Sequence, residues 1–301
     1  MGLLDGKVAL VTGASRGVGR GVASMLAAEG VRVVAAARTL TPEEAPRIGP
    51  DGTPLAGSLN ETVAAIEKTG GKCLAVRCDL TDEGDIARAV ERAVAECGQL
   101  DIVVNNALSD LSLDGDFWDI PLSAWDAMVA VGPRAYYAVA LHAAPHLIRR
   151  GGGLIVNVSA ALAAAPGYNT ALSTCCAAID RLAQGMADDL RPHNVAAVSF
   201  WPGYVRTERV LLGARGEWKD LGLGPEFDPA KEADSPELQG MAIARLAADP
   251  DLMNYSGKVQ VVTDLAARYG LVDIDGAVPK GSPRVKWLRA QRGSIAPLAY
   301  D

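Results

Sequence analysis

Short apolar runs alternate along this chain with longer segments whose apolar residues recur at helical spacing. The first run, KVALVT at residues 7–12, ends at a glycine and is typical of a parallel strand buried on both faces. After it, Val18, Val22 and Leu26 recur every four residues, as on one face of a helix. The same alternation predicts strands at residues 7–12, 31–37, 72–78, 100–104, 154–159, 195–201 and 258–263, and helices at residues 17–30, 60–69, 82–97, 123–150, 171–190 and 235–248.

This regular alternation predicts the fold class. Strands that alternate with helices of such length form a parallel sheet with helices on both faces. Because crossover connections are right-handed, we expect an α/β, doubly wound parallel sheet of the Rossmann type with about seven strands. No linker interrupts the alternation, so residues 1–301 are expected to form one domain, with residues 264–301 as a C-terminal extension. The polar stretch at residues 39–58 receives no assigned element.

Composition narrows the classes of function. The net charge is −7, which argues against nucleic-acid binding as the main function. No run reaches the ~18 apolar residues that span a bilayer, and the first residues lack the features of a signal peptide. The five cysteines match no zinc-binding spacing and are interpreted as reduced thiols. We therefore expect a cytoplasmic protein with no membrane, nucleic-acid or metal partner.

A glycine-rich turn, TGASRGVG, joins the first predicted strand to the first predicted helix at residues 12–19. Glycines at this junction allow a tight turn and let the backbone approach a pyrophosphate, while the helix start supplies free N–H groups and a positive dipole end. The strand–turn–helix context favours dinucleotide binding over a purely structural turn. The residues expected to contact the phosphates are Gly13, Ser15, Arg16, Gly17, Val18 and Gly19.

Further segments follow in the order found in one known family. NNA at residues 105–107 closes the fourth predicted strand, and PGxxxT spans residues 202–207. With the glycine turn, these motifs resemble the short-chain dehydrogenase/reductase (SDR) family over residues 5–270. Residues 131–132, 201–203 and 265–276 are similar to its dehydrogenase/reductase member 1 branch. The resemblance implies that a cofactor contacts Asp79, Leu80, Asn106, Ala107, Pro202, Gly203 and Thr207.

The residue after the second predicted strand indicates which cofactor is preferred. A carboxylate there would bind the ribose 2′-hydroxyl of NAD and repel a 2′-phosphate. This chain has Arg38 at that position and Arg16 in the glycine turn. Two guanidinium groups suit a phosphate better than a hydroxyl, so we predict NADP(H). The alternative is that both arginines merely face solvent.

The resemblance also implies a catalytic set that this chain lacks. Family members use a serine, a tyrosine and a lysine four residues after the tyrosine, with an asparagine in the preceding helix. Aligned without gaps on AAIDRLA at residues 177–183, this chain has Leu172 at the tyrosine position and Cys176 at the lysine position. Ala160 takes the serine position and Gly132 the asparagine position. Because losing a general acid costs about 10²–10⁴ in rate, ordinary carbonyl reduction is not expected.

Nearby residues are candidates to replace the missing groups. Tyr168 precedes Leu172 by one helical turn, so its hydroxyl is a candidate proton donor; the alternative is an aromatic lining of the pocket. Ser159 is a candidate to bond a substrate oxygen, although a hydroxyl at a strand end more often bonds backbone. Cys176 is conceivable as a nucleophile, but a small packed residue is favoured, because no histidine is near in sequence.

The pocket walls predict a bulky hydrophobic small-molecule substrate. Residues 108–125 are expected to supply Phe117, Trp118 and Trp125 to one wall, although core packing is an equal alternative for each of them. Residues 204–237 are expected to form a lid. Three functions remain open: an atypical NADP-dependent oxidoreductase that reduces an activated C=N or C=C bond, a non-redox cyclase, isomerase or lyase, and an inactive cofactor-binding scaffold or sensor. By analogy with relatives, the protein is expected to form a dimer or tetramer.

Overall fold

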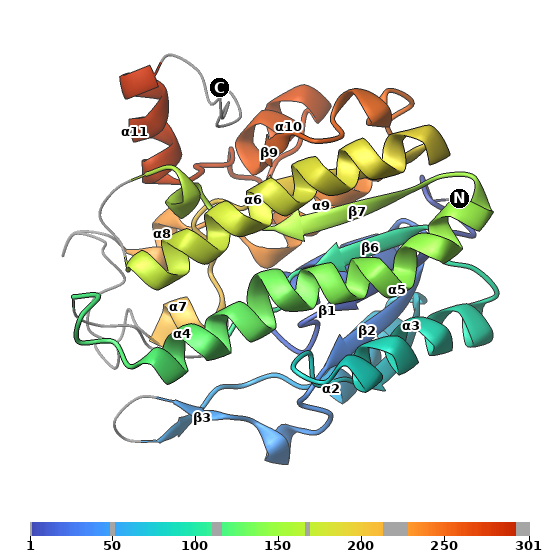
Figure 1. Ribbon diagram of the computed structural model, residues 1–301, viewed down its shortest axis with the longest axis horizontal. Coiled ribbons are helices and arrows are strands. Elements are labelled where there is room, and N and C mark those ends of the chain that lie inside the picture. Colours follow the sequence, from blue (N-terminus) through green and yellow to red (C-terminus); the bar gives the residue numbers. More distant parts are fainter. Residues whose placement is uncertain (1, 49–51, 110–115, 166–168, 213–227, 293–301) are drawn as a thin grey trace.

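The computed structural model describes residues 2–48, 52–109, 116–165, 169–212 and 228–292. A parallel sheet of seven strands, in the order β5-β2-β1-β6-β7-β8-β9, forms its centre (Figure 1). The strand order reverses between β1 and β6, which is the topological switch point where ligands bind in such sheets. The strands are β1 Val8–Thr12, β2 Arg32–Ala37, β5 Lys72–Arg77, β6 Ile102–Asn105, β7 Gly153–Val158, β8 Val195–Trp201 and β9 Val259–Val261.

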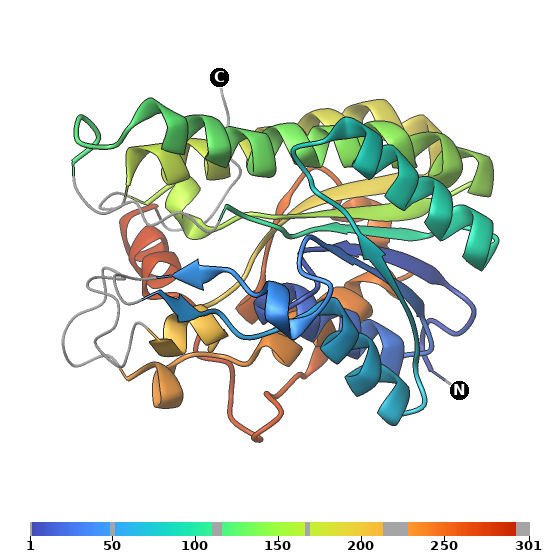
Figure 2. The same ribbon diagram turned by 90° about the horizontal axis from the view of Figure 1, so that it is seen from below.

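Helices cover both faces of the sheet, which confirms the predicted doubly wound α/β fold (Figure 2). Successive residues of β1 point to opposite faces, with Ala9 and Val11 in one core and Val8 and Leu10 in the other. The first face carries α1 Gly17–Ala28, α2 Leu59–Lys68, α9 Pro236–Ala247 and α10 Val262–Tyr269, and the second carries α3 Glu83–Cys97, α5 Ala135–Arg150 and α6 Thr170–Leu190. The other helices are α4 Leu122–Val129, α7 Glu208–Leu212, α8 Pro229–Glu232 and α11 Pro283–Arg292.

The single long helix predicted at residues 123–150 is wrong in one respect. A five-residue π-helical stretch, Ala130–Arg134, separates α4 from α5, and Gly132 has non-helical dihedrals within it. Pro133 has no N–H to continue the helical ladder, so the chain locally widens there. The bend directs Val131 toward the cavity described below.

Two other regions also differ from the sequence-based expectation. The stretch at residues 39–58 contains a 3-10 turn, Pro42–Glu44, and a two-stranded antiparallel ribbon formed by β3 Arg47–Ile48 and β4 Thr53–Pro54. The last strand ends at Val261 rather than at residue 263, because α10 starts with Val262. The described part of the C-terminal extension is therefore helical at α10 and α11, and α10 packs against one face of the seven-stranded sheet.

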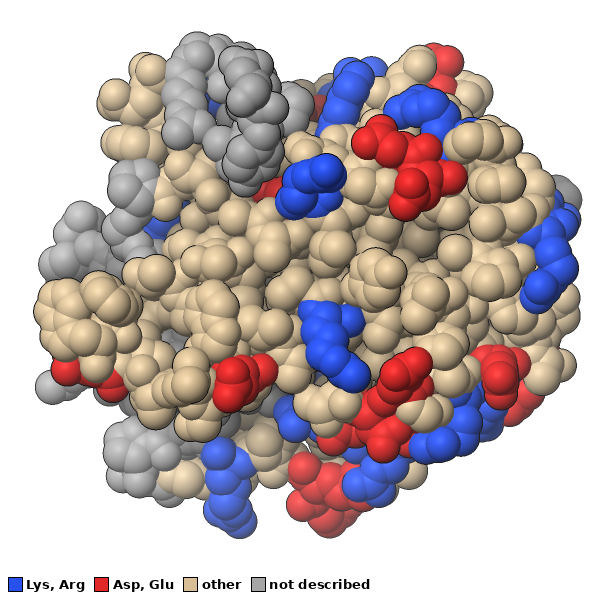
Figure 3. Space-filling model, in the orientation of Figure 1, with Lys and Arg blue, Asp and Glu red and all other residues tan. Residues whose placement is uncertain are grey.

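The face formed by α5 and α6 carries few charges near its centre (Figure 3). Tyr137 and Leu141 of α5 are more than half exposed there, at 56% and 52%. Small residues, Ala177, Ala178 and Gly185, occur on the partly exposed part of α6. Among the described helices, none is long and apolar enough to cross a membrane.

Candidate functional site

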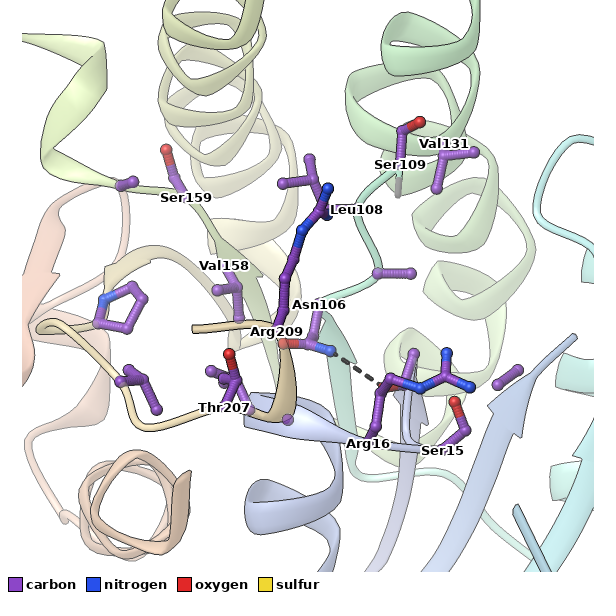
Figure 4. Close-up of a pocket in the computed structure, with 18 of the residues that line it drawn as sticks. Ser15, Arg16, Asn106, Leu108, Ser109, Val131, Val158, Ser159, Thr207 and Arg209 are labelled. Atoms are coloured by element: carbon purple, nitrogen blue, oxygen red, sulfur yellow. Dashed lines mark hydrogen bonds between the residues drawn. The ribbon is translucent and has the colours of Figure 1, made fainter. Parts of the chain in front are cut away.

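A cavity of about 460 Å³ opens at the carboxyl ends of the strands, at the switch point of the sheet (Figure 4). Residues that directly follow six different strands meet in it, because parallel strands end at the same edge. One end reaches the start of α1 and the other reaches α6. The lining residues that follow β1, β2, β5, β6, β7 and β8 include Gly13, Arg38, Asp79, Asn106, Ser159 and Pro202.

Two glycines of the turn, Gly13 and Gly19, have no space for a side chain. Gly13 has φ +67°, and a Cβ on it would lie 2.9 Å from the Ala107 Cα. A Cβ on Gly19 would lie 2.3 Å from the main-chain oxygen of Gly13. The turn is fixed by Asn106, whose Nδ2 donates to the Thr12 carbonyl at 3.0 Å. This cradle of backbone fits a phosphate group, which needs close approach to N–H groups.

The start of α1 already has an anionic neighbour. Arg16 is its N-cap residue and makes no side-chain capping bond, and the first turn contains no acidic residue. Instead, the N–H of Gly17 donates to Oε2 of Glu208 in α7 at 2.9 Å. A carboxylate at this end of a helix is favourable because it satisfies a free N–H and complements the helix dipole.

The two arginines predicted to select the cofactor lie in different surroundings. The Arg16 guanidinium donates to the carbonyls of Ala56 and Gly57 at 3.0 and 2.8 Å, so it holds the stretch at residues 39–58 against the cavity. Arg38 also lines the cavity, and it is exposed. Asp79 follows β5 and accepts bonds from the N–H and hydroxyl of Thr81. Of the two guanidinium groups, Arg38 is therefore the one placed at the solvent-facing rim.

A buried carboxylate lies behind the other end of the cavity. Asp180 of α6 is 7% exposed, and its Oδ1 accepts bonds from the Ser199 hydroxyl at 2.5 Å and from the Trp201 indole at 3.1 Å. Burial raises the pKa of Asp180, although bonds from Ser199, Trp201 and Ser159 oppose the shift. Ser159 lines the cavity and donates to the Cys176 carbonyl at 3.0 Å. Ser159 thus links the cavity to a buried acid.

The thiol of Cys176 is unsuited to nucleophilic attack. Cys176 is 5% exposed, and burial raises the pKa of its thiol to about 12, with a further contribution from the nearby Asp180 charge. A thiol with such a pKa stays protonated at neutral pH, which favours the packed-residue interpretation. Three of the residues at the family's catalytic positions, Ala160, Leu172 and Cys176, line the cavity. The fourth, Gly132, does not, and the preceding residue Val131 lines the cavity instead. Tyr168 lies outside the described residues. The prediction that Phe117, Trp118 and Trp125 line the cavity is wrong for the described lining: Phe117 and Trp118 are exposed, and Trp125 packs against the Met128 cluster.

One phenol that the sequence analysis did not consider, Tyr136, reaches the cavity from α5. Tyr136 of α5 lines the cavity, and its hydroxyl donates to the Val158 carbonyl at 3.2 Å. Its side chain is 1% exposed, and burial raises its pKa. The spacing was a usable signal, because Tyr136 lies four residues after Gly132 and hence on the same side of a helix. The sequence does not show, however, which face of α5 meets the cavity.

The lid was predicted over residues 204–237, of which residues 213–227 lie outside the described part of the chain. Its described ends are joined by a bridge, which we call the neck. Val205 and Asp234 form an isolated bridge, in which Arg206 N donates to the Asp234 carbonyl at 2.8 Å and Asp234 N donates to the Tyr204 carbonyl at 2.7 Å. Arg206 also pairs with Asp273 at 3.4 Å, beyond the neck. The two ends of the 205–234 segment are therefore held side by side, and the start of the segment lines the cavity.

The cavity brings together nearly all the residues predicted for the cofactor. Every residue of that set lines it except Gly19, which lies directly under the turn against Gly13 and Asn106. Figure 4 also shows Arg209 of α7 extending toward Leu108 inside the cavity. Sequence reasoning missed the residues whose importance depends on long-range contacts, namely Tyr136, Asp180, Glu208 and Arg209. Asp180 had a visible signal, a charge one helical turn from Cys176 on an apolar helix face.

Comparison with known proteins agrees with this geometry. The family model of the short chain dehydrogenases matches residues 7–47 and 54–212, and the chain belongs to this family. Dehydrogenase/reductase SDR family member 1 of Mus musculus is 37% identical over 283 residues, which cover 91% of this chain and 85% of that protein.

Solved structures of the same family share the fold. A putative dehydrogenase from Xanthomonas campestris superposes with a TM-score of 0.74 at 26% identity, covering 92% of this chain and 95% of that one. A short chain dehydrogenase from Mycobacterium paratuberculosis, solved bound to NAD, superposes with a TM-score of 0.72 at 25% identity, covering 86% of this chain and 97% of that one. Family membership makes the chain an oxidoreductase of the class that uses nicotinamide dinucleotides.

Proposed function

We propose that this oxidoreductase binds NADP(H) and reduces an activated C=N or C=C bond in a bulky hydrophobic substrate. The observation that carries the proposal is the single cavity that joins a phosphate cradle to an end lined by Leu172 and Cys176. When bound, the cofactor supplies a hydride. Neither a leucine nor a buried protonated thiol can pass a proton to a developing alkoxide in the manner of the family's tyrosine and lysine.

The choice of an activated substrate follows from that proton balance. A ketone that accepts a hydride at carbon must also receive a proton at oxygen. An iminium ion accepts the hydride at carbon and becomes a neutral amine, so no proton donor is needed. For an enone, hydride addition at the β carbon leaves an enolate, which takes its proton from water. Ser159 lines the cavity and would stabilise the enolate oxygen after turning its hydroxyl away from the Cys176 carbonyl.

The choice of NADP(H) rests on charge at the rim. Arg38 follows β2 and lines the cavity at the position where a carboxylate would select NAD. Arg16 is engaged with carbonyl groups, so its contribution to a 2′-phosphate is expected to be smaller. A non-redox cyclase, isomerase or lyase would need the same apolar end but would gain nothing from Arg38.

The test is calorimetric titration of the purified full-length protein with NADPH and with NADH. We expect NADPH to bind about 10- to 100-fold more tightly, because a charge-assisted contact to the 2′-phosphate contributes about 1.5–3 kcal/mol. Arg38→Gln is expected to remove most of this preference and to leave NADH binding nearly unchanged. Arg32→Gln, which neutralises an exposed arginine at the opposite end of β2, is the matched control.

Hydride transfer is then tested with model acceptors. Stopped-flow absorbance of bound NADPH should decay with a cyclic iminium salt such as a dihydroisoquinolinium and stay constant with benzaldehyde. Tight NADPH binding without oxidation by iminium or enone acceptors would favour the non-redox alternative. Equal affinity for NADPH and NADH in the unmodified protein would contradict the choice of cofactor.

We also propose that the protein self-associates through α5 and α6. The proposal is supported by the exposed Tyr137 and Leu141 and by the scarcity of charge at the centre of that face (Figure 3). Adjacent small residues on α6 would allow two copies to approach closely. Light scattering of the unmodified protein and of Leu141→Glu tests this: we expect a dimer or tetramer in the first and a smaller species in the second.

A further inference from the structure

An internal carboxylate is bound at the helix start where the cofactor's pyrophosphate is proposed to bind. Glu208 Oε2 accepts the N–H of Gly17 at 2.9 Å, across 191 positions of sequence. Thr207 and Glu208 lie beside Gly17, because a Cβ on Gly17 would be 3.3 Å from Thr207 Cγ2 and 3.7 Å from Glu208 Oε2. The start of α7 is thus packed directly against the first residue of α1.

The contact gives α1 an anion that its own sequence does not supply. The N-cap residue of α1, Arg16, makes no side-chain capping bond, and the first turn has no acidic residue. The other helices that pack near it are capped locally; α9, for example, begins at Ser235, whose hydroxyl accepts from Leu238 N. Glu208 therefore performs for α1 the role that a local carboxylate performs elsewhere.

A carboxylate and a pyrophosphate cannot bind the same N–H group. Both are anions attracted by the same free N–H groups and helix dipole, and each would repel the other at this distance. We propose that Glu208 is an internal competitor of the cofactor, which caps α1 in the free protein and must leave Gly17 when the pyrophosphate binds. This inference rests on the proposed NADP(H) function and adds to it a gate at that same site.

The gate couples cofactor binding to the substrate end of the cavity. Glu208 and Arg209 are consecutive residues of the short helix α7, and Figure 4 shows the Arg209 side chain extending toward Leu108. α7 begins directly after the Val205–Asp234 bridge, and Thr207 N donates to the Val205 carbonyl at 2.7 Å. A displacement of Glu208 that carries the α7 backbone with it would also shift Arg209, and cofactor entry would then reshape the substrate end.

Calorimetry on full-length variants tests the gate. NADPH is titrated into the unmodified protein, Glu208→Gln and Glu237→Gln, the last of which removes the same charge from the first turn of α9 and serves as the matched control. We expect Glu208→Gln to bind NADPH about 3- to 10-fold more tightly, because the competing charge is gone, and Glu237→Gln to bind as the unmodified protein does.

A second measurement separates competition from a merely structural role. Without nucleotide, Glu208→Gln should melt at a lower temperature than the unmodified protein, since α1 loses its anion. With saturating NADPH, the difference should shrink or reverse. Competition therefore predicts that Glu208→Gln melts at a lower temperature without nucleotide but binds NADPH more tightly than the unmodified protein. A contact that only stabilised the fold would lower the melting temperature without tightening NADPH binding.

Three outcomes would overturn the proposal, and they are distinguishable. If the unmodified protein and Glu208→Gln bind NADPH with equal affinity, the gate is excluded and the proposed function is unaffected. Weaker binding by Glu208→Gln would make Glu208 a contributor to the cofactor site rather than its competitor. If neither protein binds NADPH or NADH, the proposed function fails, and the gate with it.

Discussion

The two ends of the cavity are built from different parts of the chain. At the α1 end, main-chain groups and missing side chains form the site, as the clash of any Cβ on Gly13 or Gly19 shows. At the α6 end, side chains form it, and Ser159, Cys176 and Asp180 interact across two elements. A backbone site requires particular glycines, whereas a side-chain site can exchange its residues while the fold is kept. Differences in chemistry within one fold are therefore expected at the α6 end.

The largest expected effect tests the backbone end. Gly19→Ala would place a Cβ 2.3 Å from the Gly13 oxygen and 2.5 Å from Asn106 Nδ2, so the turn must move. We expect NADPH affinity to fall about 1,000-fold, which corresponds to about 4 kcal/mol, as measured by calorimetry. Gly185→Ala is the control, because its Cβ would meet only the flexible Arg181 at 3.5 Å and should stabilise α6 by about 0.5–1 kcal/mol. Unchanged NADPH affinity in Gly19→Ala would show that the turn does not hold the cofactor.

The next effect tests the side-chain end. Asp180→Leu leaves the buried hydroxyl of Ser199 and the indole N–H of Trp201 without their acceptor. We expect it to lower the free energy of unfolding by about 2–5 kcal/mol in urea denaturation. Asp180→Asn keeps an oxygen acceptor in place and should cost much less. Equal losses in both variants would mean that packing, not hydrogen bonding, determines the cost.

The contribution of Asp180 to the free energy of unfolding is expected to depend on pH. Burial raises the pKa of Asp180 in the folded protein, so the folded state holds its proton more tightly than the unfolded state does. Stability from this group is therefore present below the unfolded pKa and is lost as pH rises through the folded pKa. Measured against Asp180→Asn, the unmodified protein should lose stability as pH rises from about 4, the unfolded value. A flat difference would contradict the raised pKa.

The smallest effect concerns thiol reactivity. Cys176 is buried and its pKa is raised to about 12, whereas Cys97 is half-buried at the end of α3 and its pKa is raised by burial to a smaller degree. Brief treatment of the folded protein with iodoacetamide at pH 7.5 should label Cys97 well before Cys176, as read by peptide mass spectrometry. Rapid labelling of Cys176 would revive the nucleophile hypothesis.

The α1 end of the cavity could be predicted from the sequence better than the α6 end. The strands and the glycine turn depend on local sequence pattern. The structure places the seven predicted strands in one sheet and the cofactor residues at its carboxyl edge. The break at Gly132 was missed because apolar periodicity continues through it, although Pro133 marks it in the sequence. The contact of Glu208 with Gly17 joins distant parts of the chain, so no local pattern could indicate it.

The prediction for Ser159 also shows that local sequence does not reveal tertiary neighbours. Its candidate role depended on its place at the end of a strand, and the structure places it on the cavity wall. The sequence could not show that Ser159 lies near Asp180 as well as near the Cys176 carbonyl, because β7 and α6 meet only in the folded protein. Tertiary contacts decide which polar residues act together, and those contacts require the sheet order.

The bridge between Val205 and Asp234 has a consequence for how such enzymes diverge. Because the bridge already holds the two ends of this segment together, we expect the length of the chain between α7 and α8 to have little effect on the stability of the sheet. Doubling the length of a flexible loop costs only about 0.6 kcal/mol in closure entropy. We expect insertions and deletions between residues 212 and 228 to be tolerated, because Thr207 and Glu208 keep their contacts with the start of α1 at the nucleotide end. New specificity can then arise without a new fold.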